Sequence, residues 1–558
     1  MEKELKPFQS IGLCFSGGGY RATFFALGVI SYLDKINYKD SNLLENVEAI
    51  STVSGGTLLG VAYAKAAQNS TFNFNSFFKE FYNTFKPEND KLLATAIAKF
   101  ENDDVWENNP HKKRTLINAF ALTYAEMDLF KGSFNLFKNT NSNHLKQVCF
   151  NATDFSFGLP FRFQNTGNFG NKPLHNSQIK KLQFKTQLGD IVASSSCFPL
   201  GFEPIVYPDD YYKDQNSNDY KALKSLDRFI DGVGIMDGGI TDNQGIGSMI
   251  NMSKRSQKKG ELDLIMINDV GSFKMNPWKS DTSSIKKTTS LKENISKILN
   301  YFSFKPIYWI LLLVGILIII VNSLELIKNN SWTSLYIIGS IVAGIGFTLS
   351  ILGGVGSILK SIGKSWFKKV FKKNVPEALI DDISSFNSLS ISLVERMIKD
   401  RVSSTLTMVN DIFLKQIRRL NYNLLYSKPS LNHRITTSTV YELNGEKTAY
   451  TSTFKYNKEI KPAPSTVLKN IGLTASETPT TLWWDKTDVS KNRMETLISC
   501  GQFTTCYKLL DYILELKKDE ELKEKIDISA IDKLYKLLLK DWKKFNENPL
   551  FLVEELKQ

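Results

Sequence analysis

A run of three glycines near the start of the chain could hold a negatively charged group. Residues 15–21 read F-S-G-G-G-Y-R, after the apolar run Ile11–Phe15 and before a segment with helical periodicity. Glycines let successive backbone N–H groups turn toward one point, and a helix N-terminus adds partial positive charge. The negatively charged group that binds there would be either a phosphate or the oxyanion of an acyl-transfer reaction. The loop matches neither the G-x-G-x-x-G dinucleotide pattern nor the lysine-bearing phosphate loop.

A second motif places a serine where an apolar strand gives way to a helix. Residues 52–56 read T-V-S-G-G after the apolar run Val47–Val53. A serine on such a turn is typical of a nucleophile elbow, in which small neighbours relieve crowding, as in G-x-S-x-G. Here Thr52 replaces the first glycine, whereas Gly56 is kept. Ser54 is therefore the expected nucleophile, with Ser51 as its rival and a helix-capping role as the alternative.

A third motif offers a carboxylate. Residues 236–243 read M-D-G-G-I-T-D-N, and the two glycines after Asp237 leave space around its side chain at the end of a strand. A turn aspartate is the common alternative for any Asp-Gly pair. Asp231, which is followed by a single glycine, is a nearby competitor for the same role.

In this order, the three motifs resemble those of the patatin-like phospholipase family. That family has a G-G-G-x-R oxyanion loop, an elbow serine and an aspartate in D-G-G or D-G-A, and it works with a Ser-Asp dyad. The resemblance covers about residues 8–270 and includes two weaker blocks, N-A-T-D at 151–154 and A-S-S-S-C-F-P at 193–199. It implies a serine lipid acyl hydrolase of phospholipase A or lysophospholipase type, with no metal and no cofactor. The implied site residues are Ser54 and Asp237 as the catalytic pair, with Gly17, Gly18, Gly19, Arg21 and Gly55 around the oxyanion.

The histidine content agrees with a dyad. The four histidines lie in polar, loop-like segments outside any evident catalytic motif (His111, His144, His175 and His433). In a dyad, Ser54 attacks an ester carbonyl while Asp237 takes its proton, and water then releases the acyl-enzyme. Two other functions stay open. An alcohol in place of water would make the protein a lipid transacylase. A protein that oligomerises and perturbs membranes, or acts as a scaffold, such as a bacterial defence effector, would need no catalysis.

The elements that must position these residues alternate between strand and helix. Buried strands are expected at Ile11–Phe15, Val47–Val53 and 264–267, and helices at 22–36 and 57–67. This alternation predicts an α/β protein with a parallel or mixed sheet and helices on its faces. Together with the resemblance, it predicts a patatin-like three-layer α/β/α catalytic domain over residues 1–273.

Two charge-free runs then predict a helical hairpin across a membrane. Residues 307–321 and 332–359 carry no charge, and a bilayer core needs ~20 helical residues, which gives spans at about 306–324 and 332–359. Tyrosine and tryptophan near the ends of the runs suit the membrane interface. A buried core hairpin and a re-entrant or interfacial hairpin are the alternatives. Gly346, Ser350 and Gly354 recur every four residues, a ridge suited to close helix packing, and the hairpin could also support a homo-oligomer.

The positive charge is concentrated beside this hairpin. The chain has a net charge of +13. Residues 274–305 hold seven lysines against two acids, and residues 360–373 hold six lysines and no acid. The positive-inside rule therefore puts both flanks, and the catalytic domain with them, in the cytoplasm. The expected partners are membrane phospholipids, with anionic headgroups drawn to the lysine-rich flanks, rather than nucleic acid. Five scattered cysteines form no metal or disulfide pattern and suit a reducing compartment.

The rest of the chain, residues 374–558, is predicted to be a cytoplasmic mixed α/β extension packed on the catalytic domain. Apolar residues spaced by three at 380–389, and an apolar stripe over 402–426, predict helices. Residues 435–443 and 447–454 are rich in β-forming side chains and are joined across an Asn-Gly pair, which predicts a β-hairpin. The intervening residues 274–373 hold the basic flanks and the hairpin.

Overall fold

The computed structural model describes residues 5–140, 144–199, 201–256, 262–272, 278, 306–324, 332–362, 391–445 and 461–558. It forms two compact units. The first joins Met1–Lys274 with Leu414–Gln558, and the second is Met275–Phe413. The expected boundary at residue 374 lies outside the described residues, and the first unit resumes at Leu414.

An eight-stranded mixed sheet forms the centre of the first unit, in the order β10-β9-β1-β4-β5-β8-β7, with β6 paired to β5. Strands β10, β9, β1, β4 and β5 run parallel, whereas β6 and β8 are antiparallel to β5, and β7 is antiparallel to β8. The strands are β1 Ile11–Phe15, β4 Val47–Val53, β5 Gln147–Asp154, β6 Leu159–Gln164, β7 Ile205–Tyr207, β8 Val233–Asp237, β9 Leu264–Asp269 and β10 Ile435–Thr439, and the short β2 Asn37–Tyr38 and β3 Ser41–Asn42 pair separately.

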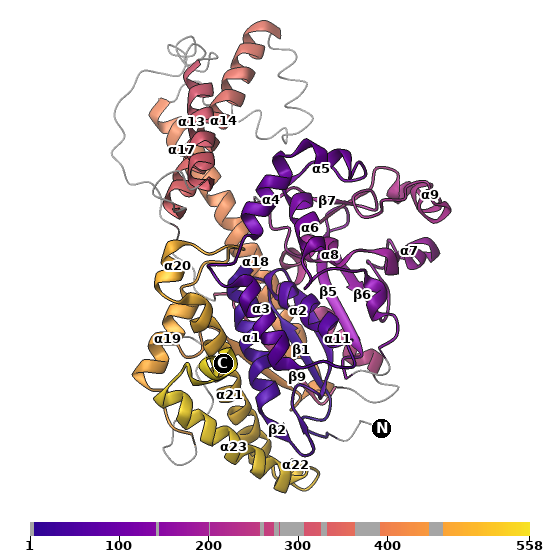
Figure 1. Cartoon of the computed structure of the whole chain (residues 1–558), viewed down its shortest axis with the longest axis vertical. Coiled ribbons are helices and arrows are strands. Elements are labelled where there is room, and N and C mark those ends of the chain that lie inside the picture. Colours follow the sequence, from indigo (N-terminus) through magenta and orange to yellow (C-terminus); the bar gives the residue numbers. More distant parts are fainter. Residues whose placement is uncertain are drawn as a thin grey trace. The chain divides into compact units, whose positions relative to one another are not determined.

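Helices cover both faces of this sheet, so the three-layer α/β/α expectation is confirmed (Figure 1). Along β1, Leu13 and Phe15 point into a core shared with α1, α2 and α21, whereas Cys14 points into a second core with Met249 of α11 and Leu425 of α18. The helices of this unit are α1 Gly19–Lys35, α2 Gly55–Ala66, α3 Phe74–Phe85, α4 Leu92–Glu101, α5 Asp103–Glu107, α6 Leu116–Glu126, α7 Ser177–Leu182, α8 Leu188–Ser195, α9 Asn218–Lys224, α10 Gly239–Asp242, α11 Ile246–Ser256, α18 Leu414–Tyr426, α19 Thr466–Ser476, α20 Lys486–Ser490, α21 Arg493–Lys518, α22 Glu520–Lys523, α23 Ile528–Glu547 and α24 Phe551–Lys557.

The C-terminal region shares the core of the catalytic domain. Strand β10 extends the sheet by pairing with β9 in parallel. Helix α21 lies along α1 (Figure 1), and the approach is close because a methyl group added at Gly28 would lie 2.0 Å from the carbonyl oxygen of Ile498. The strand expected over 435–443 ends at Thr439. Its expected hairpin partner, 447–454, and the repeat at 380–389 lie outside the described residues.

The second unit contains an antiparallel pair of apolar helices, α13 Pro306–Ser323 and α14 Thr333–Ile362, followed by α17 Ile391–Thr407 and the π-helical turn Met408–Phe413. Glycines let the pair approach closely. A methyl group at Gly315 would lie 2.3 Å from the backbone nitrogen of Ala343, and one at Gly346 would lie 2.4 Å from that of Leu312. Gly346 of the expected ridge therefore lies in this contact, whereas the side chains of its other two members are outside the described residues.

The turn between α13 and α14 is closed by a side chain. Asn322 donates to the carbonyl oxygen of Trp332 at 2.9 Å and accepts from its N–H at 2.7 Å. By length and composition, α13 is the one helix of the described part of the chain that could cross a membrane, and the apolar stretch Thr333–Thr348 of α14 is shorter. This is weak evidence of a membrane association, and the two-span arrangement stays a prediction.

Candidate active site

Ser54 lies on a sharp turn between β4 and α2. Its backbone has φ 50° and ψ −124°, a conformation that non-glycine residues rarely adopt and that persists only where the surroundings enforce it. The enforcing contact is a 2.9 Å hydrogen bond from its N–H to Oγ of Ser195. The side chain is buried but not sealed, with 8% of the residue exposed. This is the geometry of a nucleophile elbow.

Thr52, which stands where the elbow pattern has glycine, is accommodated by a glycine one helical turn into α2. A methyl group added at Gly60 would lie 2.5 Å from Cγ2 of Thr52, so the absent side chain at Gly60 makes room for the threonine. The Thr52 hydroxyl shares a 2.9 Å hydrogen bond with Thr57, which satisfies it in the core. The departure from the G-x-S-x-G pattern therefore leaves the turn intact.

The glycine-rich loop packs directly against this elbow. Gly18 and Gly19 have φ values of 142° and 52°, which favour glycine. A methyl group at Gly55 would lie 2.0 Å from the carbonyl oxygen of Gly19, and one at Gly17 would lie 3.0 Å from Cβ of Ser54. The amide of Gly17 donates to the carbonyl oxygen of Asn243 at 2.9 Å. Those of Gly18, Gly19 and Gly55 make no hydrogen bond with the described residues.

Asp237 ends β8 on the other side of the elbow. Its Oδ1 accepts a 2.7 Å hydrogen bond from the N–H of Gly239, and its carboxyl group lies close to the Ser54 hydroxyl. Burial raises the pKa of Asp237 to about 6, although the Ser54 hydroxyl and the N–H of Gly239 oppose the rise. A carboxylate of this pKa is ionised at neutral pH and is a stronger base than an ordinary aspartate.

The strand register explains why Ser54 and Asp237 meet. In β4 and β5, Val53 pairs with Asn151, so Ser54 follows at the level of Ala152. In β5 and β8, Ala152 pairs with Asp237. The two residues therefore lie on either side of one position of β5, close enough for their side chains to meet.

The two rivals are placed differently. Ser51 lies within β4, fully buried, and its hydroxyl donates to the carbonyl oxygen of Gly245 at 2.7 Å and accepts from Nδ2 of Asn151 at 3.0 Å. Asp231 lies in the turn that enters β8, with its side chain exposed, a whole strand away from Asp237. Neither contacts Ser54 in a recorded hydrogen bond. None of the four histidines does so either.

Arg21 points to the C-terminal region rather than to Ser54. All three of its recorded hydrogen bonds go there, to the hydroxyl of Tyr441 at 3.1 Å and to the carbonyl oxygens of Ser476 and Thr478 at 3.3 and 3.1 Å. The guanidinium therefore sits beside the oxyanion loop without a recorded contact to Ser54 or Asp237.

Sequence reasoning gives no role to two side chains that the structure brings to the site. Oγ of Ser195 holds the Ser54 backbone, and it donates to the carbonyl oxygen of Asn151 at 2.6 Å. Oδ1 of Asn243 fills the space beside both Gly17 and Gly239, since methyl groups there would lie 2.4 and 2.7 Å away. The signal for Ser195 is the block at 193–199. Asn243 is the last residue of the M-D-G-G-I-T-D-N motif.

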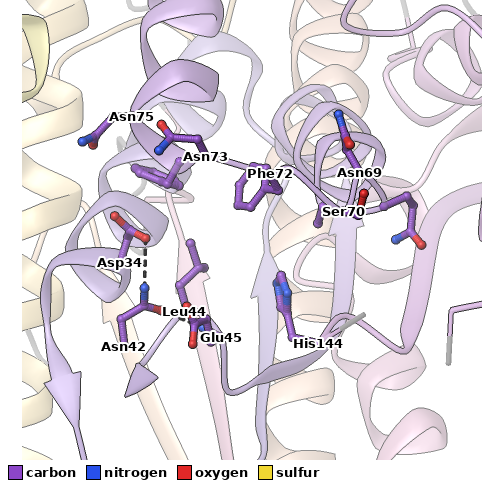
Figure 2. A pocket seen from close by; sticks show the side chains of 13 residues that line it. Asp34, Asn42, Leu44, Glu45, Asn69, Ser70, Phe72, Asn73, Asn75 and His144 are labelled. Atoms are coloured by element: carbon purple, nitrogen blue, oxygen red, sulfur yellow. Dashed lines mark hydrogen bonds between the residues drawn. The ribbon is translucent and has the colours of Figure 1, made fainter. Parts of the chain in front are cut away.

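A cavity of about 740 Å3 lies elsewhere in this unit. Figure 2 shows Asp34, Asn42 and His144 among its lining residues, with Asn42 donating to Asp34. Its walls come from segments that follow α2 and precede β4 and β5, so it opens at the amino ends of these strands, opposite Ser54. It is therefore not the access route to Ser54. In the residues that the structure describes, no group of His, Cys, Asp and Glu is arranged to hold a metal ion.

Residues 13–250 match the family model described as patatin-like phospholipase, a range that contains the glycine-rich loop, Ser54 and Asp237. No curated protein matches the chain.

Proposed function

Residues 13–250 form a patatin-like phospholipase domain, which indicates a lipid acyl hydrolase, and from this premise we propose that Ser54 and Asp237 are its catalytic dyad. The observation that carries the proposal is the proximity of the Ser54 hydroxyl to the buried Asp237 carboxyl group, whose pKa the hydroxyl lowers against the effect of burial. The strained backbone of Ser54 supports it, because such conformations concentrate at functional sites.

In the proposed mechanism, Asp237 accepts the proton of the Ser54 hydroxyl as Oγ attacks the ester carbonyl of a lipid. The tetrahedral intermediate collapses, the proton passes to the leaving alcohol, and the acyl group stays on Ser54. Water then attacks the acyl-enzyme while Asp237 takes its proton, and this proton passes to Oγ of Ser54 as the bond to the acyl group breaks and the fatty acid leaves. The raised pKa of Asp237 makes the carboxylate a better proton acceptor at neutral pH.

The oxyanion would be held by backbone amides of the glycine-rich loop and the elbow. Gly18, Gly19 and Gly55 are the best candidates, because their N–H groups are not engaged by the described residues. Gly17 contributes through its lack of a side chain, since its amide is bonded to Asn243. Arg21 would act on the loop rather than on the oxyanion, since its recorded hydrogen bonds go elsewhere.

We further propose that α13 and α14 cross the membrane as a hairpin with both flanks in the cytoplasm. Leucine and isoleucine side chains are exposed along both helices, among them Leu313, Leu317, Ile337 and Ile341, which is costly in water and typical of lipid-facing surfaces. The thirteen flanking lysines favour cytoplasmic flanks beside anionic headgroups.

The edge of the sheet that carries Ser54 would face this membrane. The turn after β5 extends beyond Ser54 along the strand direction, and it exposes Phe155 by 61% and Phe157 by 49%. The chain leaves the first unit at Lys274, five residues after the carboxyl end of β9. It returns at Leu414, one helical turn before Arg418, whose guanidinium donates to Asp269 at the carboxyl end of β9. An apolar tip and both connections thus lie at the catalytic edge.

The test is Ser54→Ala in the full chain, assayed on phospholipid vesicles and on a dispersed short-chain ester. A loss on the order of 10³-fold or more in kcat is expected with both substrates. Ser51→Ala is the matched control, since it removes a hydroxyl from β4, the strand that leads into Ser54, and it should stay active. Lipid analysis separates hydrolysis, which yields free fatty acid, from transfer to an added alcohol. Near wild-type rates in Ser54→Ala would refute the dyad.

A further inference from the structure

A short segment of the C-terminal region lies directly on the glycine-rich loop. We refer to residues 476–484, which connect α19 to α20, as the clamp segment. The carbonyl oxygen of Thr481 accepts a 2.8 Å hydrogen bond from the N–H of Tyr20, the second residue of α1. A methyl group at Gly19 would lie 2.2 and 2.3 Å from the carbonyl oxygens of Thr480 and Thr481. The loop therefore has the clamp segment on one side and the elbow on the other.

Trp484 fixes the far end of the clamp segment. Its ring lies 5.0 Å from that of Tyr20 and 5.1 Å from that of Phe24, and its Nε1 donates to the carbonyl oxygen of Phe85 at 2.8 Å. Both aromatic partners are on α1, so the clamp segment is anchored to the helix that the glycine-rich loop opens. These contacts partly bury the aromatic ring and satisfy its N–H, so they anchor this end of the segment.

Arg21 fixes the near end of the clamp segment. Its guanidinium donates hydrogen bonds to the carbonyl oxygens of Ser476 and Thr478, the first and third residues of the segment. It also donates to the hydroxyl of Tyr441 and lies 5.8 Å from the centre of that ring. These recorded acceptors carry no charge, and burial lowers the pKa of Arg21. All three hydrogen bonds leave one nitrogen, Nη1, which lies one bond farther from the backbone than a lysine ammonium would, so a lysine at this position would not reach all three acceptors.

We propose that Arg21 is a positioning residue that locks the clamp segment onto the glycine-rich loop, so that the C-terminal region completes the oxyanion hole. The inference rests on the proposed role of Ser54 and of the loop amides. Consecutive glycines lose much conformational entropy when they are ordered, and stabilisation of an oxyanion needs donors that are already in place. The Gly17 amide anchors one end of the loop on Asn243, and the clamp segment anchors the other end at Tyr20.

An alternative role for Arg21 is direct contact with the oxyanion or a lipid phosphate. The two roles differ in what Tyr441 does. If Arg21 acts through the clamp segment, removal of the Tyr441 hydroxyl weakens the hold of Arg21 on that segment. Tyr441→Phe should then lower activity only while Arg21 is present. If Arg21 binds the substrate through its charge, Arg21→Lys should keep much of the activity, and Tyr441→Phe should have an independent effect or none.

The experiment is a double-mutant cycle on the full chain with Arg21→Ala, Tyr441→Phe and the pair, assayed on a dispersed short-chain ester. Arg21→Ala should lower kcat by about 10²-fold, the scale expected when catalytic groups shift by about 1 Å, with little change in KM. Tyr441→Phe should lower kcat by about tenfold, as for one hydrogen bond to a charged group, and should add nothing to Arg21→Ala. Arg21→Lys should resemble Arg21→Ala. Tyr426→Phe is the matched control, because it removes a hydroxyl of the same region that bonds Thr437, and it should not change kcat.

Hydrogen exchange gives a readout that does not depend on activity. The amide of Tyr20, bonded to Thr481, should exchange faster in Arg21→Ala and in Tyr441→Phe, and at the wild-type rate in Tyr426→Phe. Unchanged exchange at Tyr20 in Arg21→Ala, additive losses in the double variant, or a fully active Arg21→Lys would each overturn the proposal. If Ser54→Ala stayed active, the dyad would fall, whereas the exchange at Tyr20 would still decide whether the clamp segment holds the loop.

Discussion

Replacement of Asp237 by asparagine should abolish ester hydrolysis and, at neutral pH, stabilise the fold. The activity loss follows from the proposed base, and it should be on the order of 10³-fold or more. The gain in stability follows from burial, because the carboxylate is charged at neutral pH in a site that raises its pKa from 3.8 to about 6. Asparagine is nearly isosteric and keeps an oxygen for the N–H of Gly239.

The sign and size of the effect follow from proton linkage. The folded state holds the Asp237 proton more tightly than the unfolded state does, so stability falls as pH rises from about 4 to about 6. Above that window the cost is complete, and it is about 3 kcal/mol because each tenfold change in proton affinity is worth about 1.4 kcal/mol. Below pH 4 both states are protonated and the cost vanishes. Asp237→Asn should therefore gain up to about 3 kcal/mol over wild type at pH 7–8, and little at pH 4.

The assay compares the unfolding midpoints of detergent-solubilised wild type and variant at pH 4 and pH 7.5, with kcat/KM followed from pH 4.5 to 8. In the wild type, kcat/KM for a short ester should rise with an apparent pKa of about 6, so that the rate at pH 5 is roughly a tenth of the plateau. Asp231→Asn, at an exposed position, is the matched control and should change neither quantity much. A variant that is less stable than wild type at pH 7.5, or a stability difference that is the same at both pH values, would refute the reasoning.

Three other outcomes are expected. Gly55→Ala should inactivate the enzyme at least as strongly as a lost oxyanion donor, about 10²-fold, because its methyl group would collide with Gly19; an active Gly55→Ala enzyme would exclude the tight contact of elbow and loop. Serine at both Phe155 and Phe157 should slow hydrolysis of vesicles but not of a dispersed short ester, and equal slowing of both would argue against an apolar tip that meets the membrane. In a cysteine-free background, cysteine probes at positions 290 and 365 should be labelled only from the cytoplasmic side and one at Asn330 only from the outside, and cytoplasmic labelling at Asn330 would favour a re-entrant hairpin.

The strands nearest the site are predictable from sequence because they are buried on both faces. Ile11–Phe15 and Val47–Val53 read as continuous apolar runs, as expected for parallel strands covered by helices on both sides. In β9 the apolar residues end at Ile267, whereas the strand itself continues through Asn268 and Asp269. Those two polar residues stand at the carboxyl edge, and there Asp269 pairs with Arg418 from a segment far along the chain.

Features that depend on distant segments escape the sequence analysis. Helix α1 begins at Gly19, before the expected start at Ala22, although glycine is a poor helix former. The Tyr20 amide in that first turn is bonded to Thr481, a partner that no local pattern reveals. Similarly, the segment expected as half of a local hairpin is β10, which pairs with β9 in parallel. Its expected hairpin partner, 447–454, lies outside the described residues, so the local hairpin stays a prediction.

Within the candidate site, residue types are easier to predict than residue roles. The sequence singles out Ser54 and Asp237, and the structure puts them within hydrogen-bonding reach of each other. It also singles out Arg21 as part of the oxyanion loop, yet the guanidinium bonds the C-terminal region. The motif fixes the backbone position of an arginine, whereas the direction of a long side chain depends on what packs above it, and that comes from residues 441–478.

The second unit is inserted in the connection that follows β9. Strand β9, helix α18 and strand β10 form a strand–helix–strand unit in which β10 pairs with β9, and Met275–Phe413 is inserted between the strand and its helix. The loop after a parallel strand lies at the carboxyl edge of the sheet, where α/β proteins bind their ligands. An insertion there leaves the strand register and both cores intact, because it only lengthens a surface connection. The connection to the second unit therefore starts from the edge of the sheet where Ser54 lies, and not from the opposite edge, which holds the polar cavity around Asp34 and His144.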